Sequence, residues 1–344
     1  MRSTPMKVLV TGANGHIGCN VVRELLSKGY EVKAFVRKNS NLKGLEGLDI
    51  EYAYGDVMQL DTLAPAALGC ERIIHLAAVY KTIAQTAEEI VEPAVIGSKN
   101  IFEAAKQAGI KRVVYTSSVA SIGFSNSPDH MRDGNDWNDD AQNPYYVAKT
   151  QSEKVAQQLS REYDIELIVL CPALVLGAYD YRVTPSNQLV MDWLNGIGQT
   201  YRGGLNLVDV RDVAAAHVAA LEKGENRKRY VLGGDNMIVK DIGLLLKKIS
   251  GIKPMHLAMP RAITLIFASI VESVSKLIGI RPLFTKDLVY EVIDRYGFYD
   301  CSDTNATFGI KPRNTEACLK SSIKWLSENG KIKASVLKKI KDKL

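Results

Sequence analysis

Several features are missing from this sequence of 344 residues, and each absence excludes a class of protein. No run of 18 apolar residues occurs, so a membrane-spanning helix is not expected. The start, MRSTPMKVLV, lacks the apolar segment of a signal peptide, which argues against secretion. The five cysteines are odd in number and none has a close partner, so neither a disulfide framework nor a C-x-x-C motif is predicted. These absences favour a protein of the reducing cytoplasm, and we predict no bound metal.

The composition is that of a globular protein, because 46% of the residues are hydrophobic and 24% are charged. Those values exclude a disordered, collagen-like or coiled-coil chain. The formal net charge is +6, and much of the surplus lies in residues 331–344, which contain six lysines and one aspartate. No basic patch with interleaved aromatic residues is visible, so a nucleic-acid partner is not expected.

Strand and helix patterns alternate along the first half of the chain, which predicts an α/β protein with a Rossmann-type, doubly wound parallel sheet. The predicted strands are residues 7–11, 31–36, 49–53, 72–76, 112–116 and 165–170. The predicted helices are residues 17–28, residues 87–108 and a segment that begins near Tyr145. We expect residues 1–176 to bind a dinucleotide, with residues 205–235 returning to that domain through strands at 205–208 and 229–232. Residues 177–344 would form a smaller, mainly helical substrate domain that ends in a basic tail, residues 331–344.

A glycine-rich segment, TGANGHIG, joins the first predicted strand to the first predicted helix. Gly12 permits a tight turn, Gly15 lets the backbone approach a pyrophosphate, and Gly18 allows close packing. The free N–H groups of the helix N-terminus favour a phosphate there. The segment therefore predicts a dinucleotide site that also includes the loop residues Asn14, His16 and Ile17. A plain glycine turn is the alternative.

The choice of cofactor depends on the end of the second strand, where an acidic residue would bind the ribose hydroxyls. This chain has Arg37 and Lys38 there and no acid, which favours NADP(H) over NAD(H) because guanidinium suits a phosphate. An ordinary basic surface loop is the alternative. After the third strand, we expect Asp56 to lie beside the adenine amine and Val57 to contact the cofactor as well. The alternative for Asp56 is a loop or cap residue.

Tyr145 and Lys149 are four residues apart and so share one face of a predicted helix. An ammonium group there lowers the pKa of the phenol, which can then exchange a proton with a carbonyl or alcohol oxygen. The strand at 112–116 ends in two serines, Ser117 and Ser118, and a serine hydroxyl can hold the same oxygen. A Y-x-x-x-K pair alone is usually a surface pair. Here it follows a glycine-rich loop and a strand that ends in serine, and this combination indicates a catalytic site.

These three motifs, TGANGHIG, the serine pair and YYVAK, resemble those of the extended short-chain dehydrogenase/reductase family from Met6 to about Trp325. The segments HLAA, VDVRDVA and FGIKPRNTEACLKSSIKWL fit the same family. Within it, EPAVIGSKN, the Asp136–Asn138 turn and YYVAKTQSEKVA are similar to the dihydroflavonol 4-reductase and cinnamoyl-CoA reductase branch.

The resemblance implies a catalytic triad of Ser118, Tyr145 and Lys149, with Ser117 as a backbone or packing residue. It also implies that Lys149 holds the nicotinamide ribose. The further cofactor contacts that it implies are Ala77 and Ala78 of HLAA, Pro172 and Val175.

Other polar residues are interpreted as structural. We expect His75 to be a satisfied core histidine and Cys171 a small packed residue. Asp209 and Asp212 would cap and charge a helix start. Tyr80 follows HLAA and is a candidate for lining the substrate cleft, but the sequence does not decide between this role and none.

Two further segments have helical periodicity. Residues 263–280 form an amphipathic helix whose apolar face would pack in the second domain or line an apolar substrate pocket. In the tail, Ile332, Val336, Ile340 and Leu344 recur at four-residue spacing, and we expect a solvated or frayed terminal helix; contact with an anionic membrane is the weaker alternative.

The resulting hypothesis is an NADP(H)-dependent reductase or dehydrogenase that acts on a small carbonyl or alcohol compound, with a homodimer as a possible assembly. A nucleotide-sugar epimerase or dehydratase is the second hypothesis, although Leu205 stands where such enzymes have a phosphate-binding arginine. Arg202 could substitute for that arginine. A non-catalytic NADP sensor is the third hypothesis, which would expect a broken triad.

Overall fold

The computed structural model describes residues 5–77, 88–257, 259–278 and 285–340. Its centre is a seven-stranded sheet in the order β10-β6-β5-β4-β1-β2-β3, in which every pair of neighbours is parallel. The strands are β1 (Lys7–Thr11), β2 (Glu31–Val36), β3 (Glu51–Tyr54), β4 (Arg72–His75), β5 (Arg112–Thr116), β6 (Glu166–Pro172) and β10 (Arg229–Leu232). The predicted fold class is therefore confirmed.

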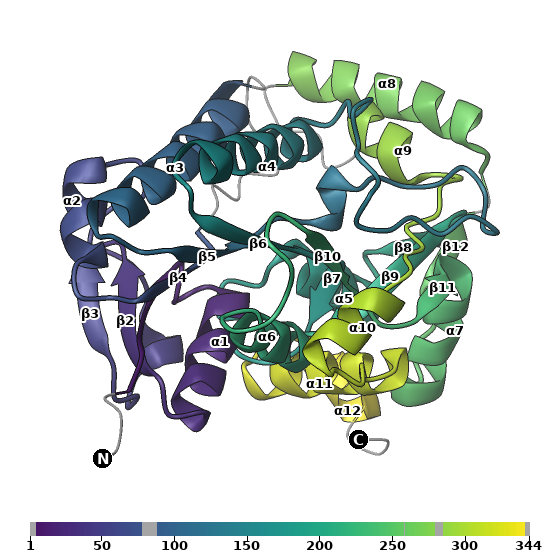
Figure 1. The fold of residues 1–344 in the computed structure, drawn as a ribbon. Coiled ribbons are helices and arrows are strands. Elements are labelled where there is room, and N and C mark those ends of the chain that lie inside the picture. The colour runs from purple at the N-terminus through teal and green to yellow at the C-terminus, as the bar shows by residue number, and fades with distance from the viewer. Residues whose placement is uncertain (1–4, 78–87, 258, 279–284, 341–344) are drawn as a thin grey trace.

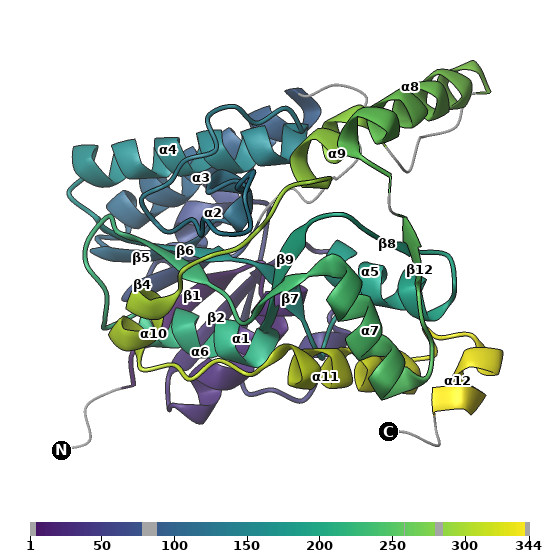
Figure 2. The same cartoon turned by 90° about the vertical axis from the view of Figure 1, so that its right-hand side faces the viewer.

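Helices cover both faces of this sheet (Figures 1 and 2). One face carries α2 (Leu60–Ala67), α3 (Glu88–Gln107) and α4 (Pro144–Glu162), and the other carries α1 (His16–Ser27) and α6 (Val210–Ala219). Helix α2 was not predicted from the sequence: it is short and contains Pro65, which weakens a helical pattern. The 3-10 helices are η1 (Lys43–Leu45) and η2 (Val119–Ser121).

The C-terminal region adds two small sheets and a second group of helices. The first sheet has the order β11-β9-β7, and in the second β12 pairs with β8. These strands are β7 (Leu174–Leu176), β8 (Gln199–Tyr201), β9 (Gly204–Asp209), β11 (Asn236–Ile238) and β12 (Met255–Leu257). The helices are α5 (Pro185–Leu194), α7 (Val239–Ser250), α8 (Arg261–Leu277), α9 (Lys286–Val292), α10 (Ser302–Phe308), α11 (Thr315–Glu328) and α12 (Ala334–Ile340). The division into domains at residue 176 stays a prediction.

Two hydrophobic cores correspond to these two groups of elements. The larger core lies between the main sheet and its helices, and strands β1, β4 and β5 are almost wholly buried because both faces of the sheet are covered. The second core joins α5, α7 and α11 around Trp193, which is fully buried. No helix in the described part of the chain has the length and apolar character to cross a bilayer.

The expectation of a solvated or frayed terminal helix is wrong for the described part of the tail. Ile332 and Ile340 are only 4% and 1% exposed, and both belong to the second core. Helix α12 contacts α7, so its apolar positions have a packing partner. Leu344 lies outside the described residues.

The expectation that the apolar face of residues 263–280 packs inside the protein is also wrong. Ile266 and Ile270 of α8 are 64% and 57% exposed, whereas the small side chains Thr264 and Ala268 are buried. The periodicity correctly predicted an amphipathic helix but assigned its large apolar side chains to the wrong environment.

Candidate active site

The glycine-rich segment forms a tight loop between β1 and α1. Gly12 has φ +69°, and a Cβ there would lie 2.8 Å from the backbone nitrogen of Ala77. A Cβ on Gly18 would lie 2.2 Å from the carbonyl oxygen of Gly12, so no larger residue fits at that position. Gly15 precedes α1, and no side chain caps the helix start. The first turn of α1 therefore offers backbone N–H groups to an anion.

The side chains of the other loop residues all contact the protein, each with a different partner. The amide of Asn14 donates to the carbonyl of Asn41 at 3.2 Å. The imidazole of His16 is buried, with Nδ1 3.9 Å from a carboxylate oxygen of Asp180, and burial lowers its pKa. Ile17 packs against the main core. Contacts of His16 and Ile17 with a cofactor would therefore run through their backbone N–H groups.

A cleft of about 620 Å³ lies beyond the carboxyl ends of β2 and β3. Arg37, Lys38, Asp56 and Arg182 are among the residues that line it. The three cationic side chains have no hydrogen-bond or ion-pair partner among the described residues, so they are available to an anion. Arg182 belongs to the loop after β7, and no local motif pointed to it in the sequence. One oxygen of Asp56 accepts the N–H of Met58 at 3.0 Å, so this residue shapes its own loop and also borders the cleft.

The remaining predicted cofactor contacts lie at the ends of neighbouring strands. The Val57 carbonyl accepts from Asn100 at 2.9 Å, and the N–H of Ala77 donates to the hydroxyl of Thr11 at 3.3 Å. Pro172 is the last residue of β6, and Val175 lies in β7, where it is 8% exposed. Ala78 and Tyr80 lie outside the described residues.

Tyr145 and Lys149 line one small cavity at the carboxyl end of the sheet. Asn143 positions the start of their helix, because its side chain accepts the backbone N–H of Tyr145 at 3.0 Å. The residues that line the cavity are His75, Ala77, Ala94, Ser98, Tyr115, Thr116, Tyr145, Ala148, Lys149 and Ser152. Ser118 is not among them. Its hydroxyl lies just beyond the end of β5 and accepts the N–H of Ala120 at 3.1 Å, which caps η2.

The ammonium group of Lys149 is held against the end of β5. Its Nζ donates to the carbonyl oxygen of Thr116 at 3.3 Å. Burial lowers the pKa of Lys149 to about 8, although the nearby Cys171 and Glu153 act in the opposite direction. At pH 7 the group is therefore mainly protonated, in a site from which water is largely excluded.

The two serines after β5 have different environments. Ser117 is 3% exposed and donates to the carboxylate of Glu153, which also accepts from Ser121 at 2.7 Å. Ser118 is partly exposed. Ser117 is therefore part of a buried hydrogen-bond network with Ser121 and Glu153.

The residues interpreted as structural have matching surroundings. His75 is buried, its Nδ1 lies 2.8 Å from the Thr11 hydroxyl, and burial lowers its pKa to about 3. Burial raises the pKa of the Cys171 thiol to about 12, which makes it a poor nucleophile. Asp209 accepts the N–H of Arg211 at 2.9 Å and so caps α6.

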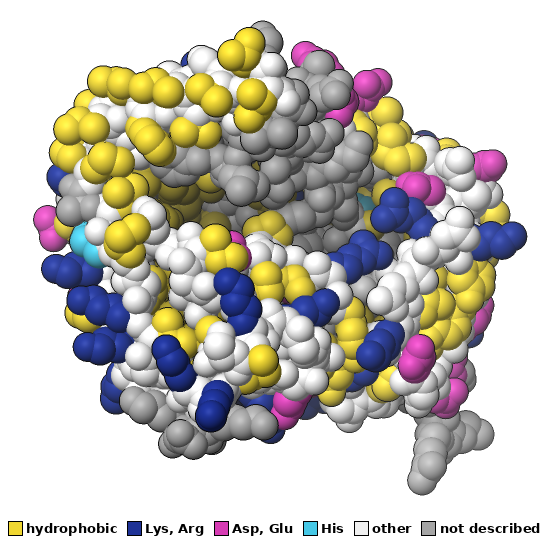
Figure 3. Space-filling view, turned by 180° about the vertical axis from the view of Figure 1, so that it is seen from behind, with side chains coloured by type: hydrophobic (Ala, Val, Ile, Leu, Met, Phe, Trp, Pro, Cys, Tyr) yellow, Lys and Arg dark blue, Asp and Glu magenta, His cyan; other side chains and the backbone are white. Residues whose placement is uncertain are grey.

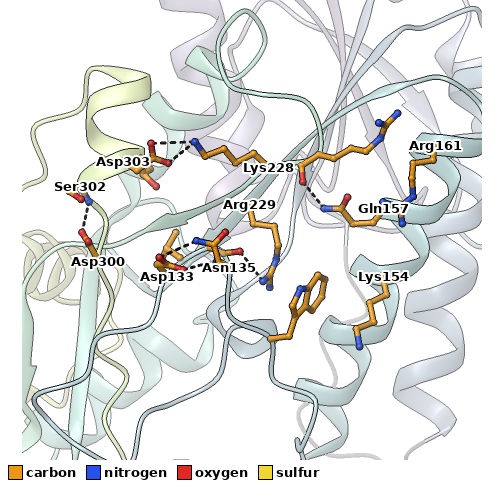
Figure 4. Close-up of a pocket in the computed structure, with 15 residues that line it drawn as sticks. Asp133, Asn135, Lys154, Gln157, Arg161, Lys228, Arg229, Asp300, Ser302 and Asp303 are labelled. Atoms are coloured by element: carbon orange, nitrogen blue, oxygen red, sulfur yellow. Dashed lines mark hydrogen bonds and ion pairs between the residues drawn. The ribbon is translucent and has the colours of Figure 1, made fainter.

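A larger groove, of about 770 Å³, lies on another face of α4 (Figure 4). Lys154, Gln157 and Arg161 of that helix border it, together with Lys228 and Arg229. Lys228 pairs with Asp303, and Arg229 pairs with Glu153. Most of the charged groups in this groove thus already have protein partners. None of the residues that line it is a tyrosine, so it has no counterpart of the Tyr145–Lys149 pair.

Comparisons with known proteins identify the family. Residues 8–233 match the model of the NAD dependent epimerase/dehydratase family. The chain belongs to this family. A nicotinamide cofactor is therefore expected, and the structure fits one, since the loop at Gly12 and Gly18 is closed to side chains and the start of α1 is open to an anion.

Individual members of the family are similar over most of their length. A Synechocystis protein with the provisional name dihydroflavonol 4-reductase is 31% identical over 336 residues, which cover 94% of this chain and 95% of the relative. Cinnamoyl-CoA reductase 1 of Petunia hybrida is 33% identical over 265 residues, 72% of this chain and 79% of the relative. Among solved structures, gox2253 has 30% identity and a TM-score of 0.83, and the match covers 95% of this chain and 99% of that one.

Proposed function

We propose that the protein is an NADP(H)-dependent carbonyl reductase of the dihydroflavonol 4-reductase type. The observation that carries this proposal is the placement of Tyr145 and Lys149 in one cavity at the carboxyl end of the parallel sheet. The names of the similar proteins, a dihydroflavonol 4-reductase and a cinnamoyl-CoA reductase, support the same class of reaction.

Each residue of the proposed triad has a distinct task. The Tyr145 hydroxyl gives its proton to the oxygen of the substrate carbonyl as that carbonyl is reduced. The Lys149 ammonium lowers the pKa of Tyr145 and holds the nicotinamide ribose. Ser118 orients the substrate oxygen by a hydrogen bond, for which its hydroxyl turns away from the N–H of Ala120. The bound cofactor supplies the hydride to the carbonyl carbon.

The preference for NADP(H) follows from the cleft beyond β2 and β3. Arg37, Lys38 and Arg182 converge on it, and a 2′-phosphate would receive charge-assisted hydrogen bonds from the two guanidinium groups. No acidic residue ends β2, so the ribose hydroxyls of NAD(H) lack their usual acceptor.

The epimerase or dehydratase hypothesis has less support. Leu205 is 2% exposed in β9, at the position where an arginine would grip nucleotide phosphates. The proposed substitute, Arg202, is engaged elsewhere, since its Nε lies 2.7 Å from the carboxylate of Asp294. The intact Tyr145–Lys149 pair likewise speaks against a non-catalytic sensor.

The state of the cysteines is that expected in a reducing compartment. All five of them are buried free thiols. Together with the absence of a disulfide framework, this supports our proposal of a cytoplasmic protein.

The experiment is a substrate panel with the purified protein. Aldehydes, ketones, and UDP- and dTDP-sugars are each incubated with NADPH, and the loss of NADPH absorbance is followed. The proposal expects oxidation of NADPH by at least one aldehyde or ketone, and the Tyr145→Phe variant serves as the control. Conversion of a nucleotide sugar without net cofactor oxidation would instead establish the epimerase hypothesis.

A further inference from the structure

Helix α8 exposes a continuous apolar stripe along one side. We call the following residues the α8 stripe: Ile263, Ile266, Phe267, Ile270, Val274, Leu277 and Ile278. Their exposed fractions lie between 49% and 86%. Figure 3 shows hydrophobic side chains gathered over the region of α8, at the upper left of that view. An exposed apolar patch of this extent marks an interaction surface in most proteins.

The side of α8 that faces the protein has mainly small side chains, with Leu265 packed beside them. Thr264, Ala268 and Ser275 are between 0% and 5% exposed, and Ala268 packs with Val289 and Ile293 near α9. A helix that packs on a globular protein normally buries its largest apolar residues. Here the largest ones point outward, which is the arrangement of a helix whose apolar side meets a second apolar medium.

The charged residues on the same side of the molecule indicate which apolar medium the α8 stripe meets. The α8 stripe contains no charged residue, and the acid on this helix, Glu272, lies 3.5 Å from the ammonium group of Lys286. Helix α7 and the loop before β12 carry the exposed Lys240, Lys247 and Lys253 and one exposed acid, Asp241, so cations are in excess there. Figure 3 shows Lys and Arg side chains below the apolar region, on the same face. An apolar stripe with cations on the same face of the molecule is complementary to an anionic lipid surface.

We propose that the α8 stripe docks this protein on the surface of an anionic lipid bilayer, with α8 lying in the interfacial layer. A second copy of the chain is a less suitable occupant. A two-fold contact through the stripe would leave the exposed lysines without an anionic partner, whereas lipid phosphates neutralise them.

The docked helix is connected to the start of the catalytic helix. Helix α9, which packs on α8, carries the fully buried Glu291. One carboxylate oxygen of Glu291 accepts the backbone N–H groups of Gln142 and Asn143, at 2.8 and 3.3 Å. Since Asn143 caps α4, the lipid surface would lie on the side of the molecule from which Tyr145 is positioned.

The test is co-sedimentation of the full-length protein with vesicles. Phosphatidylcholine vesicles with and without phosphatidylglycerol are compared, and the bound fraction is measured for the unmodified protein and for the double variant Ile266→Ser/Ile270→Ser. The matched control is Leu68→Ser/Ile197→Ser, because those residues are 56% and 67% exposed outside α8. We expect binding to the anionic vesicles, a loss of about tenfold or more in the stripe variant, and no change in the control.

Three results would overturn the proposal. The first is the absence of binding to anionic vesicles. The second is binding that survives in the stripe variant but disappears when residues 331–344 are removed, which would assign it to the tail. The third, by sedimentation velocity without lipid, is a dimer that the stripe variant dissociates, together with no vesicle binding. If the double variant does not keep the thermal midpoint of the unmodified protein, Ile263→Ser/Leu277→Ser replaces it.

Discussion

Glu153 of α4 and Arg229 of β10 form an ion pair in which the side chains are only 0% and 5% exposed. Glu153 also accepts from Ser117 and Ser121, and the guanidinium of Arg229 lies 3.7 Å from the ring centroid of Trp137. The pair therefore joins α4 to β10 and to the segment after β5. Ser117 and Ser121 are buried and Trp137 is half-buried, so little water reaches the pair even though Arg229 borders the groove of Figure 4.

Replacing Glu153 with alanine should lower the free energy of unfolding by about 3–5 kcal/mol, because the Arg229 charge is left buried and unpaired. The control is Lys154→Ala, which breaks an exposed pair with Asp139 and should cost at most about 1 kcal/mol. Urea unfolding followed by circular dichroism measures both. Equal losses in the two variants would mean that the buried ion pair contributes no more to the free energy of unfolding than the exposed one.

Replacing Tyr145 with phenylalanine should lower kcat by about 10²–10⁴-fold, because the proton donor is lost while the ring remains. Tyr146→Phe is the control. The Tyr146 ring packs on Phe124 at 6.1 Å between centroids, and burial raises the pKa of its phenol well above the usual value, so it is a poor acid. Steady-state kinetics on the carbonyl compound found in the panel, with cofactor affinity measured alongside, compares the two. A larger effect at Tyr146 would show that the catalytic register is wrong.

The cofactor preference should depend on two arginines. We expect the unmodified protein to bind NADPH at least about tenfold more tightly than NADH, since a charge-assisted phosphate contact contributes roughly 1.5–3 kcal/mol. Arg37→Asp and Arg182→Ala should each reduce that ratio, and Lys43→Ala, which does not line the cleft, should leave it unchanged. Fluorescence titration gives the affinities of the four proteins for NADPH and for NADH, and equal binding of both cofactors by the unmodified protein would end this hypothesis.

Stability should fall in mild acid because of buried histidines. The imidazole of His217 bonds to the Thr116 hydroxyl and the Val213 carbonyl, and burial lowers its pKa to about 4. A lowered pKa in the folded state means that the contribution of His217 is fully present above pH 6.5 and is lost as the pH falls toward 4.

The variant His217→Gln isolates this effect. Between pH 6 and 4.5 the unmodified protein should lose up to about 1.4 kcal/mol per pH unit through His217, and the variant should lack that part of the slope. Urea unfolding at several pH values measures it. An unchanged slope would mean that the imidazole is solvated when it becomes charged.

The C-terminal tail should matter for stability and not for turnover. Ile340→Ala should lower the free energy of unfolding by about 2–4 kcal/mol, because Ile340 is buried in the second core, and the exposed Lys339→Ala should change it by less than about 0.5 kcal/mol. Removal of residues 331–344 should likewise destabilise the protein but leave kcat nearly unchanged. A large loss of turnover in protein that is still folded would place the tail at the active site.

Much of the first half of the fold could be predicted, because each buried parallel strand is a short apolar run and the longer helices have apolar residues at three- and four-residue spacings. The strands at 7–11, 31–36 and 112–116 were predicted with the bounds that the structure shows. The small strands β7, β8, β11 and β12 have three residues each and leave no such pattern.

The candidate site shows the same division. The spacing of Tyr145 and Lys149 follows from one helix, so the sequence predicts that they share a face. Arg182 and Glu291 act on segments far away in the chain, and only tertiary structure brings them there. The environment of α8 could not be predicted either, since periodicity identifies an apolar face without indicating what will cover it.

The cleft that Arg37, Lys38 and Arg182 share has a practical consequence for protein engineering. Two segments that lie far apart in the sequence, the end of β2 and the loop after β7, supply its positive charge. A chimera that takes only the end of β2 from an NAD-binding relative would keep Arg182 and, with it, an attraction for a phosphate. Under the proposed preference for NADP(H), a change to NAD(H) therefore requires redesigning both segments together.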